Sequence, residues 1–176
     1  MQTIIPHLWY DTEAKEAAEL YVDLFGGKID WNYTITDTPS GHAGLIQFQL
    51  GDMTLAAISA GPYFKLNESM SLMVNVASKD DVSRLYETLS DGGRVLMPLG
   101  EYPFSPYYVW LEDRFGLSWQ LSYAPDLDKP YQFEICLLFS QDQVGLAQPM
   151  LDYYKDKLPQ ARLGRLSYYG EGEAAV

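Results

Sequence analysis

The amino-acid sequence predicts an α+β fold made of two copies of one strand-helix-three-strand unit. Two stretches with apolar residues at helical spacing each end in a glycine pair, at residues 26–27 and 92–93. A short apolar strand precedes each of these helices, and a basic and then a β-branched residue follow each glycine pair. After both pairs the chain continues in alternating, strand-like segments. We therefore expect two units that form one paired domain over residues 1–124.

The first unit is expected at about residues 3–60. An apolar strand at 4–10 leads to Asp11 and Thr12, which are N-cap candidates for the first helix. The glycine pair ends this helix because glycine adopts the left-handed conformation of a C-terminal cap. The three strands predicted after it are residues 28–36, 43–50 and 53–59.

The second unit is expected at about residues 69–124. Its first strand is predicted at 71–76, and Ser78 with Asp81 three positions later has the spacing of a helix capping box. The proline-rich stretch 98–106 predicts a long loop inside the unit. The three strands predicted after the helix are residues 94–99, 106–112 and 117–123.

The C-terminal stretch, residues 131–176, resembles a third unit that stops early. It has an apolar strand candidate at 133–139, helical spacing over 146–158 and a second strand candidate at 161–169. Because a half unit leaves an apolar face uncovered, we expect it to pack on the domain or on a second chain.

Composition narrows the classes of partner. The formal net charge of −12 repels nucleic acid and anionic membranes, so neither is an expected partner. The single cysteine, Cys136, excludes an intramolecular disulfide, and its apolar surroundings favour a buried, inert thiol over a nucleophile. No signal segment and no apolar run of about 18 residues is present, so we expect a cytoplasmic protein.

Several motifs support a family resemblance. Leu20 and Tyr21 lie in the first helix, and residues 113–121 read Asp-Arg-Phe-Gly-Leu-Ser-Trp-Gln-Leu before and along the last strand of the second unit. Two further motifs are Phe-Gly-Gly at 25–27 and Leu-Gly-Asp at 50–52. Together these residues resemble the vicinal oxygen chelate superfamily of glyoxalase, bleomycin-resistance and dioxygenase-like proteins, and within it the PhnB-like branch. Similar proteins are sometimes labelled ubiquinone-pathway methyltransferases, but the sequence has no Gly-x-Gly-x-x-Gly loop in a doubly wound setting for a methyl donor.

The resemblance implies that each unit curls its sheet into a half cup, with a divalent metal held between the cups by the first and last strands. Strand alternation turns His7 inward on the first strand and Gln120 inward on the last, with Ala57 at the equivalent place in the first unit. Ser71 or Met73 takes the fourth place. A catalytic metal needs several anionic or imidazole ligands, so we expect no metal, no other cofactor and no catalytic residue. For His7 a hydrogen-bonded structural role competes with that of a residual ligand or base, and His42 is expected in a solvated turn.

The same alternation predicts an aromatic, amide-lined cup that suits a flat neutral or cationic organic molecule. One alternative stays open: these aromatic residues fill a dimer or inter-unit core. Glu112 shares the parity of Trp110, and for it a role as an acid, base or cation partner competes with that of a solvated carboxylate at the strand end. The predicted ligand-binding residues are His7, Trp9, Trp31, Gln47, Met73, Asn75, Tyr108, Trp110 and Gln120.

The leading functional hypothesis is a homodimeric, metal-independent binding protein for a small molecule rather than an enzyme. One alternative is a glyoxalase-like isomerase or dioxygenase that uses His7 and Gln120 with a divalent metal. Another is an interaction module whose cup is filled by its own side chains.

Overall fold

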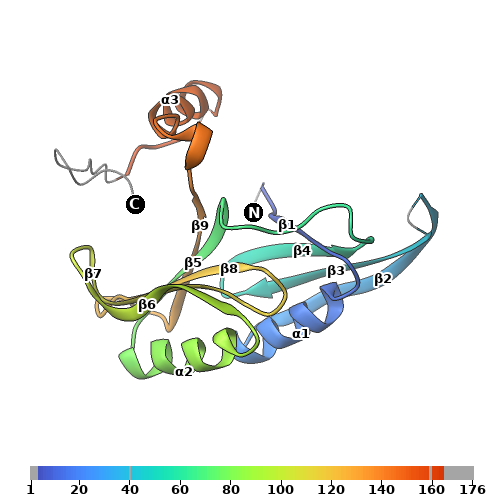
Figure 1. The fold of residues 1–176 in the computed structure, drawn as a ribbon, viewed down its shortest axis with the longest axis horizontal. Coiled ribbons are helices and arrows are strands. Elements are labelled where there is room, and N and C mark those ends of the chain that lie inside the picture. The colour runs from blue at the N-terminus through green and yellow to red at the C-terminus, as the bar shows by residue number, and fades with distance from the viewer. Residues whose placement is uncertain (1–3, 40, 159, 165–176) are drawn as a thin grey trace. The chain divides into compact units, whose positions relative to one another are not determined.

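A computed structural model describes residues 4–39, 41–158 and 160–164 of the chain. The chain divides into two compact units, Met1–Leu138 and Phe139–Val176. The first compact unit contains both repeated units and holds two mixed sheets, of four and five strands, and two helices (Figure 1). This arrangement confirms the predicted α+β class.

The first sheet has the strand order β1-β4-β3-β2, with β1 parallel to β4 and the other pairs antiparallel. The helix of the first repeated unit, α1 (Ala14–Phe25), begins after Glu13 and not after the expected N-cap residues Asp11 or Thr12. The Ser59 hydroxyl accepts the Ala14 N–H at 3.0 Å, so a side chain from the neighbouring strand replaces the local cap. The strands are β1 (His7–Tyr10), β2 (Lys28–Thr38), β3 (Gly41–Leu50) and β4 (Met53–Ser59).

The second sheet has the order β6-β7-β8-β5-β9. Its helix, α2 (Lys79–Ser90), begins where predicted, because the Ser78 side chain accepts the Asp81 N–H. The prediction of a long loop at 98–106 is wrong, since β6 continues to Tyr102 and joins β7 by a short turn. Register shifts on both sides of Pro98 accommodate a residue that cannot donate to the strand ladder. The strands are β5 (Met70–Val76), β6 (Arg94–Tyr102), β7 (Ser105–Glu112), β8 (Ser118–Tyr123) and β9 (Tyr131–Leu137).

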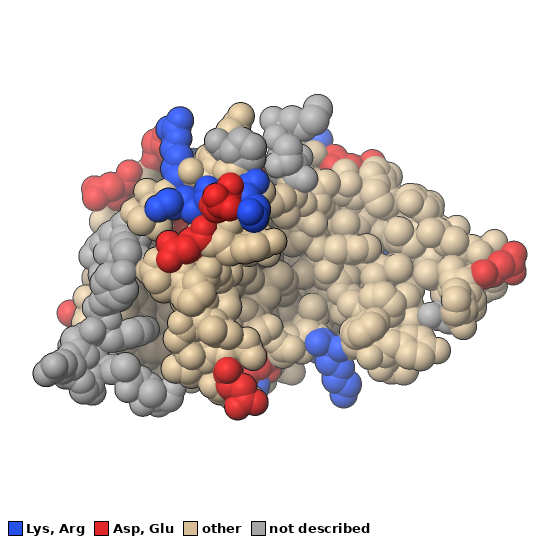
Figure 2. Space-filling view, turned by 90° about the horizontal axis from the view of Figure 1, so that it is seen from above, with Lys and Arg blue, Asp and Glu red and all other residues tan. Residues whose placement is uncertain are grey.

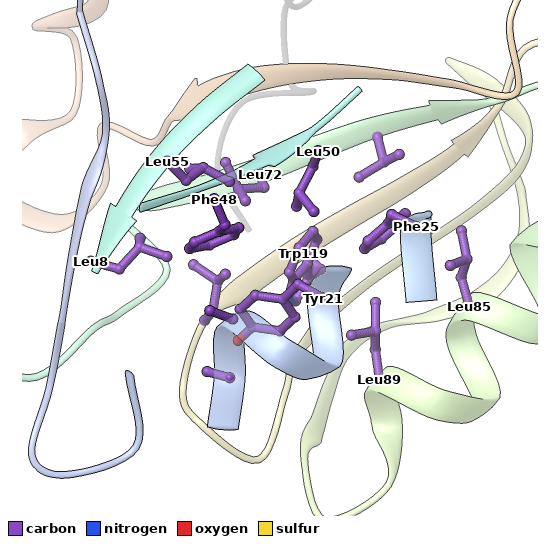
Figure 3. Packing of buried hydrophobic residues seen from close by; sticks show 14 of the residues in the cluster. Leu8, Tyr21, Phe25, Phe48, Leu50, Leu55, Leu72, Leu85, Leu89 and Trp119 are labelled. Carbon is purple, nitrogen blue, oxygen red and sulfur yellow. The ribbon is translucent and has the colours of Figure 1, made fainter. Parts of the chain in front are cut away.

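α1 and α2 lie on the same side of the two sheets (Figure 1), and one cluster of buried residues includes side chains from both helices and from strands of both sheets. Figure 3 shows Tyr21 and Phe25 of α1 beside Trp119 of β8. The rings of Phe25 and Trp119 are stacked, with centroids 5.4 Å apart. Because α1 reaches across to the second sheet, the two repeated units share one core and leave their opposite faces for other contacts.

A buried carboxylate connects the two repeated units. Asp113, in the turn between β7 and β8, accepts the Tyr21 hydroxyl at 2.6 Å and the Trp119 Nε1–H at 2.8 Å. It also accepts the backbone N–H groups of Phe115 and Leu117. Burial raises the pKa of the Asp113 carboxyl, and these four donors act against that rise. The Asp-Arg-Phe-Gly motif therefore ties α1 to the second sheet.

The strand expected to open a third unit belongs to the first compact unit. β9 runs antiparallel beside β5 and adds a fifth strand to the second sheet. The second compact unit holds a short 3-10 turn (Gln141–Gln143) and α3 (Ala147–Lys157). Of the further strand expected at 161–169, residues 161–164 are not in a strand and residues 165–169 lie outside the described residues. None of the helices in the described ranges is long and apolar enough to cross a membrane.

Candidate functional site

The site residues predicted on β1 lie on the face of the first sheet that points away from the helices. Leu8 and Tyr10 are in the core, whereas His7 is exposed and Trp9 is half-buried, as the alternation predicts. The Trp9 Nε1–H donates to the carbonyl oxygen of Gly61 at 2.8 Å, and its ring packs edge-on against Phe64. The segment between the repeated units therefore holds Trp9 in place. We call this surface the first-sheet face.

The expected inward position of Ala57 is wrong. In the parallel pairing of β1 with β4, Leu8 lies opposite Ala57 and both side chains are buried in the core. Ala56 is the residue opposite His7. The last strands of the two units are thus offset by one residue from the alignment that makes Ala57 equivalent to Gln120. The position that corresponds to Gln120 is an alanine in either register, Ala57 or Ala56. Neither side chain can bind a metal.

Asp30 lies on the same face as Trp31 and Gln47, although regular alternation would turn Asp30 and its neighbour Trp31 to opposite faces. A register shift at Asp30 turns it toward the first-sheet face, where it accepts Nε2–H of Gln47 at 3.3 Å and of Gln49 at 2.8 Å. The hydrogen bond from Gln49 is the main cause that holds the pKa of Asp30 below its usual value. Gln47 therefore already has a partner for its amide group. His42 is exposed, but it lies within β3 and not in a turn.

The second sheet carries a more closely connected set of polar side chains on its face away from the helices, which we call the second-sheet face. Met73, Gln120 and Trp110 lie directly opposite one another on β5, β8 and β7. The Tyr108 hydroxyl donates to Oε1 of Gln120 at 2.7 Å, and the Trp110 Nε1–H donates to the Ser118 hydroxyl at 2.8 Å. These bonds hold the aromatic rings and the amide in definite orientations.

β9 brings three further residues to the second-sheet face. Gln132, Glu134 and Cys136 lie opposite Asn75, Met73 and Ser71. Cys136 is half-buried rather than fully buried as expected. Sequence reasoning missed Gln132 and Glu134, because it assigned this strand to a separate unit. Alternation along β9 would have found them only once its pairing with β5 was known.

Glu112 is not a free acid on this sheet. Its Oε2 accepts from Nη2 of Arg94 at 2.9 Å, and the two residues are opposite each other on β7 and β6. This ion pair favours the solvated, paired role over that of a general acid or base.

The predicted ligand-binding residues divide between the two faces. Within the described part of the chain, no hydrogen bond or ring contact joins the first-sheet group to the second-sheet group. The first-sheet group is His7, Trp9, Trp31 and Gln47, and the second-sheet group is Met73, Asn75, Tyr108, Trp110 and Gln120.

The side chains at the four metal positions of the superfamily do not fit a divalent metal. Those positions hold His7, Ala56, Met73 and Gln120 in the observed register, which offer one imidazole and no carboxylate. Among the described residues no group of three or more histidine, cysteine or acidic side chains could hold a metal ion.

The two repeated units, their shared core and the turn at Asp113 define a protein of the vicinal oxygen chelate superfamily. The chain belongs to the family described as 3-demethylubiquinone-9 3-methyltransferase, whose model matches residues 2–122. Its described sheets are mixed and bear helices on one side, which is not the doubly wound arrangement that holds a methyl donor.

Solved structures show the same fold. The PhnB protein from Bacillus cereus is 29% identical, with a TM-score of 0.65, and the match covers 70% of this chain and 100% of that one. Protein PA1353 from Pseudomonas aeruginosa is 27% identical with a TM-score of 0.61, covering 70% and 98%. Glyoxalase I from Zea mays shares the fold alone, at 13% identity and a TM-score of 0.57, covering 88% of this chain and 54% of that one. No match was found among the curated proteins.

Proposed function

We propose that this protein is a metal-independent binding protein for a flat, small organic molecule and that it performs no catalysis. The observation that carries the proposal is the second-sheet face, where hydrogen bonds hold Trp110, Tyr108 and Gln120 around one place. The metal positions of the superfamily meanwhile offer a single imidazole.

The side chains of the second-sheet face suit stacking and hydrogen bonding rather than coordination. Trp110 and Met73 are half-buried and flank Gln120 on either side, so a flat ring can lie against the indole and the thioether. Gln120 supplies an amide between them. Catalysis of the glyoxalase or dioxygenase kind would need a metal that these residues are poorly suited to bind.

The proposal includes a homodimer, in which a second copy covers the first-sheet face. Trp31, Tyr33 and Ile35 are 37%, 50% and 41% exposed, and their partners across β3 place them on this face. Figure 2, which views the side opposite α1 and α2, shows over the right-hand part of the molecule a broad surface with charged side chains only toward its edges. A contiguous exposed apolar patch is typical of a protein interface.

A charge placed in this patch is expected to break the dimer. Tyr33→Asp puts a carboxylate into a desolvated contact, so the apparent dissociation constant should rise on the order of a hundredfold in sedimentation velocity. Asn32→Asp is the matched control, because Asn32 is exposed on the opposite face of the same strand and should leave the dimer intact. Equal sedimentation of the wild type and both variants would contradict this part of the proposal.

Loss of the Trp110 ring is expected to weaken ligand binding. The probes are flat heteroaromatic compounds in neutral, cationic and anionic forms, ranked by the melting temperature of the wild-type protein and then measured by calorimetry. Trp110→Ala should raise the Kd of the best probe by a factor of about 10 to 100, the range for an aromatic contact. Tyr153→Ala changes an exposed aromatic residue of α3 and should leave the Kd unchanged.

Metal analysis of the same preparation separates the proposal from the enzyme alternative. We expect no stoichiometric metal and no rise in melting temperature with Zn²⁺, Ni²⁺, Mn²⁺ or Fe²⁺. A stoichiometric metal that is lost in His7→Ala would instead support the glyoxalase-like or dioxygenase hypothesis.

A further inference from the structure

We infer that the ligand of the second-sheet face presents an uncharged hydrogen-bond acceptor, a carbonyl oxygen or a ring nitrogen, to the amide nitrogen of Gln120. We also infer that Tyr108 sets this preference by fixing the orientation of the amide. The inference rests on the proposed function, and it adds the chemical class of the ligand and the residue that selects it.

Gln120 lies near the middle of the second sheet. Its strand, β8, runs between β5 and β7, and the side chain is flanked by Met73 and Trp110, neither of which offers it a hydrogen-bond partner. Gln120 is 8% exposed, and among the described residues no fully buried side-chain nitrogen or oxygen lacks a hydrogen-bond partner, so its unbonded amide nitrogen keeps some contact with water. A ligand that displaces this water without replacing its hydrogen bond leaves a polar group unpaired, which is costly.

The Tyr108 hydroxyl determines which end of the amide faces the open side of the sheet. It is 2.7 Å from Oε1 of Gln120, and among the described residues this oxygen is the only hydrogen-bond partner of the phenol. The phenolic proton therefore has its acceptor only when the amide oxygen points toward Tyr108. Burial raises the pKa of Tyr108, so the phenol keeps this proton throughout the neutral range.

The amide nitrogen of Gln120 is consequently the end left for a ligand. Within the described ranges no acceptor is bonded to it, so both of its N–H groups are available. A ligand that stacks on Trp110 and carries a carbonyl oxygen or a ring nitrogen satisfies one of them, whereas a hydrocarbon of the same shape removes water and leaves both unpaired.

The surrounding charges favour an acceptor without negative charge. Glu134 lies in the same cross-strand row as Gln120, beyond Met73 on β9, and it is exposed. Neighbouring strands are about 4.8 Å apart, so its backbone lies roughly 10 Å from that of Gln120. A carboxylate ligand at Gln120 would meet this charge and the overall excess of acidic residues, 24 against 12 basic ones.

The test compares two probes of one shape. Quinoline has a ring nitrogen that accepts a hydrogen bond, and naphthalene does not. At pH 8, where quinoline is neutral, wild-type protein is expected to bind quinoline on the order of tenfold more tightly than naphthalene, the effect of one hydrogen bond to a buried group. Gln120→Leu should abolish this preference, because it weakens the binding of quinoline and leaves that of naphthalene unchanged.

A second variant tests the role of Tyr108 as a positioning residue. Tyr108→Phe keeps the ring but frees the amide to turn, so the preference for quinoline should fall and 2-naphthylamine, a donor probe, should gain affinity. As a control for folding, the urea unfolding midpoints of Gln120→Leu and Tyr108→Phe should differ from that of the wild type by no more than a surface substitution causes. A purely structural role for Tyr108 would change all three probes alike.

Two outcomes overturn the inference, and they differ in what they say of the proposed function. If quinoline and naphthalene bind equally to the wild type, or if Gln120→Leu weakens both equally, the assigned acceptor is wrong while the binding function stands. If no flat probe binds at any accessible concentration, the proposed function and the inference fail together.

Discussion

Replacing Asp113 with asparagine is expected to lower the free energy of unfolding by about 3 kcal/mol. The carboxylate accepts from Tyr21, Trp119 and two backbone N–H groups at once. Asparagine keeps the size of the side chain but exchanges one oxygen for an NH₂ group, which cannot accept a hydrogen bond. In either orientation it would face one of the two donor pairs, Tyr21 with Trp119 or the N–H groups of Phe115 and Leu117, and an unpaired polar group in a buried place costs about 1–3 kcal/mol.

Urea unfolding with a fluorescence readout measures this change, since the midpoint shifts while the slope stays constant if only stability is affected. Asp126→Asn is the control for the loss of one negative charge, because Asp126 is exposed. Equal midpoints for Asp113→Asn and Asp126→Asn would show that the link between α1 and the second sheet adds little to stability.

Alanine at Gly27 or Gly93 is expected to destabilise the fold by a similar amount, about 3 kcal/mol, at the upper end of the range for overpacking. A Cβ atom at Gly27 would overlap with the carbonyl oxygen of Gln49, and one at Gly93 with the carbonyl oxygen of Glu112. In both places the obstacle is strand backbone, which cannot move aside without disturbing the sheet. The two glycines occupy equivalent positions in the two repeated units, so the same close approach occurs twice.

Gly100→Ala is the matched control for these two variants. No described atom lies within 4 Å of a Cβ built there, and its backbone needs no left-handed conformation. Its unfolding midpoint should differ from that of the wild type by no more than a surface substitution causes. If Gly93→Ala unfolds at the same urea concentration as Gly100→Ala, close packing of the chain after α2 is not needed for stability.

Features that depend on near neighbours in the chain could be predicted from the sequence. Gly26 ends α1 in the left-handed conformation, which is a local property, and Ser78 caps α2 because the hydrogen bond spans three residues. α2 instead ends with a residue in an extended conformation, directly before its glycine pair. Trp119 and Leu121 face the core while Gln120 faces the other side, since alternation within one strand needs no knowledge of its partners.

Errors arose where a strand departs from regular geometry or where register decides the result. The shift at Asp30 brought that carboxylate to the amides of Gln47 and Gln49, and regular alternation cannot show such a shift. The offset at Ala57 moved the inward position by one residue. The shifts around Pro98 turned an expected loop into strand. In each case the deciding interactions are hydrogen bonds between strands distant in sequence.

The sequence by itself determined the repeated units, the end of α1, the start of α2 and the face that each regular strand presents, because these follow from local conformation and the period of the strand. Only the tertiary structure decided that β9 joins the second sheet and that Glu134 lies in the row of Gln120. It also decided that the Tyr108 hydroxyl donates a hydrogen bond to the amide oxygen of Gln120. Pairing between strands depends on hydrogen bonds and packing across the whole fold, and no local pattern along a single strand specifies its neighbour.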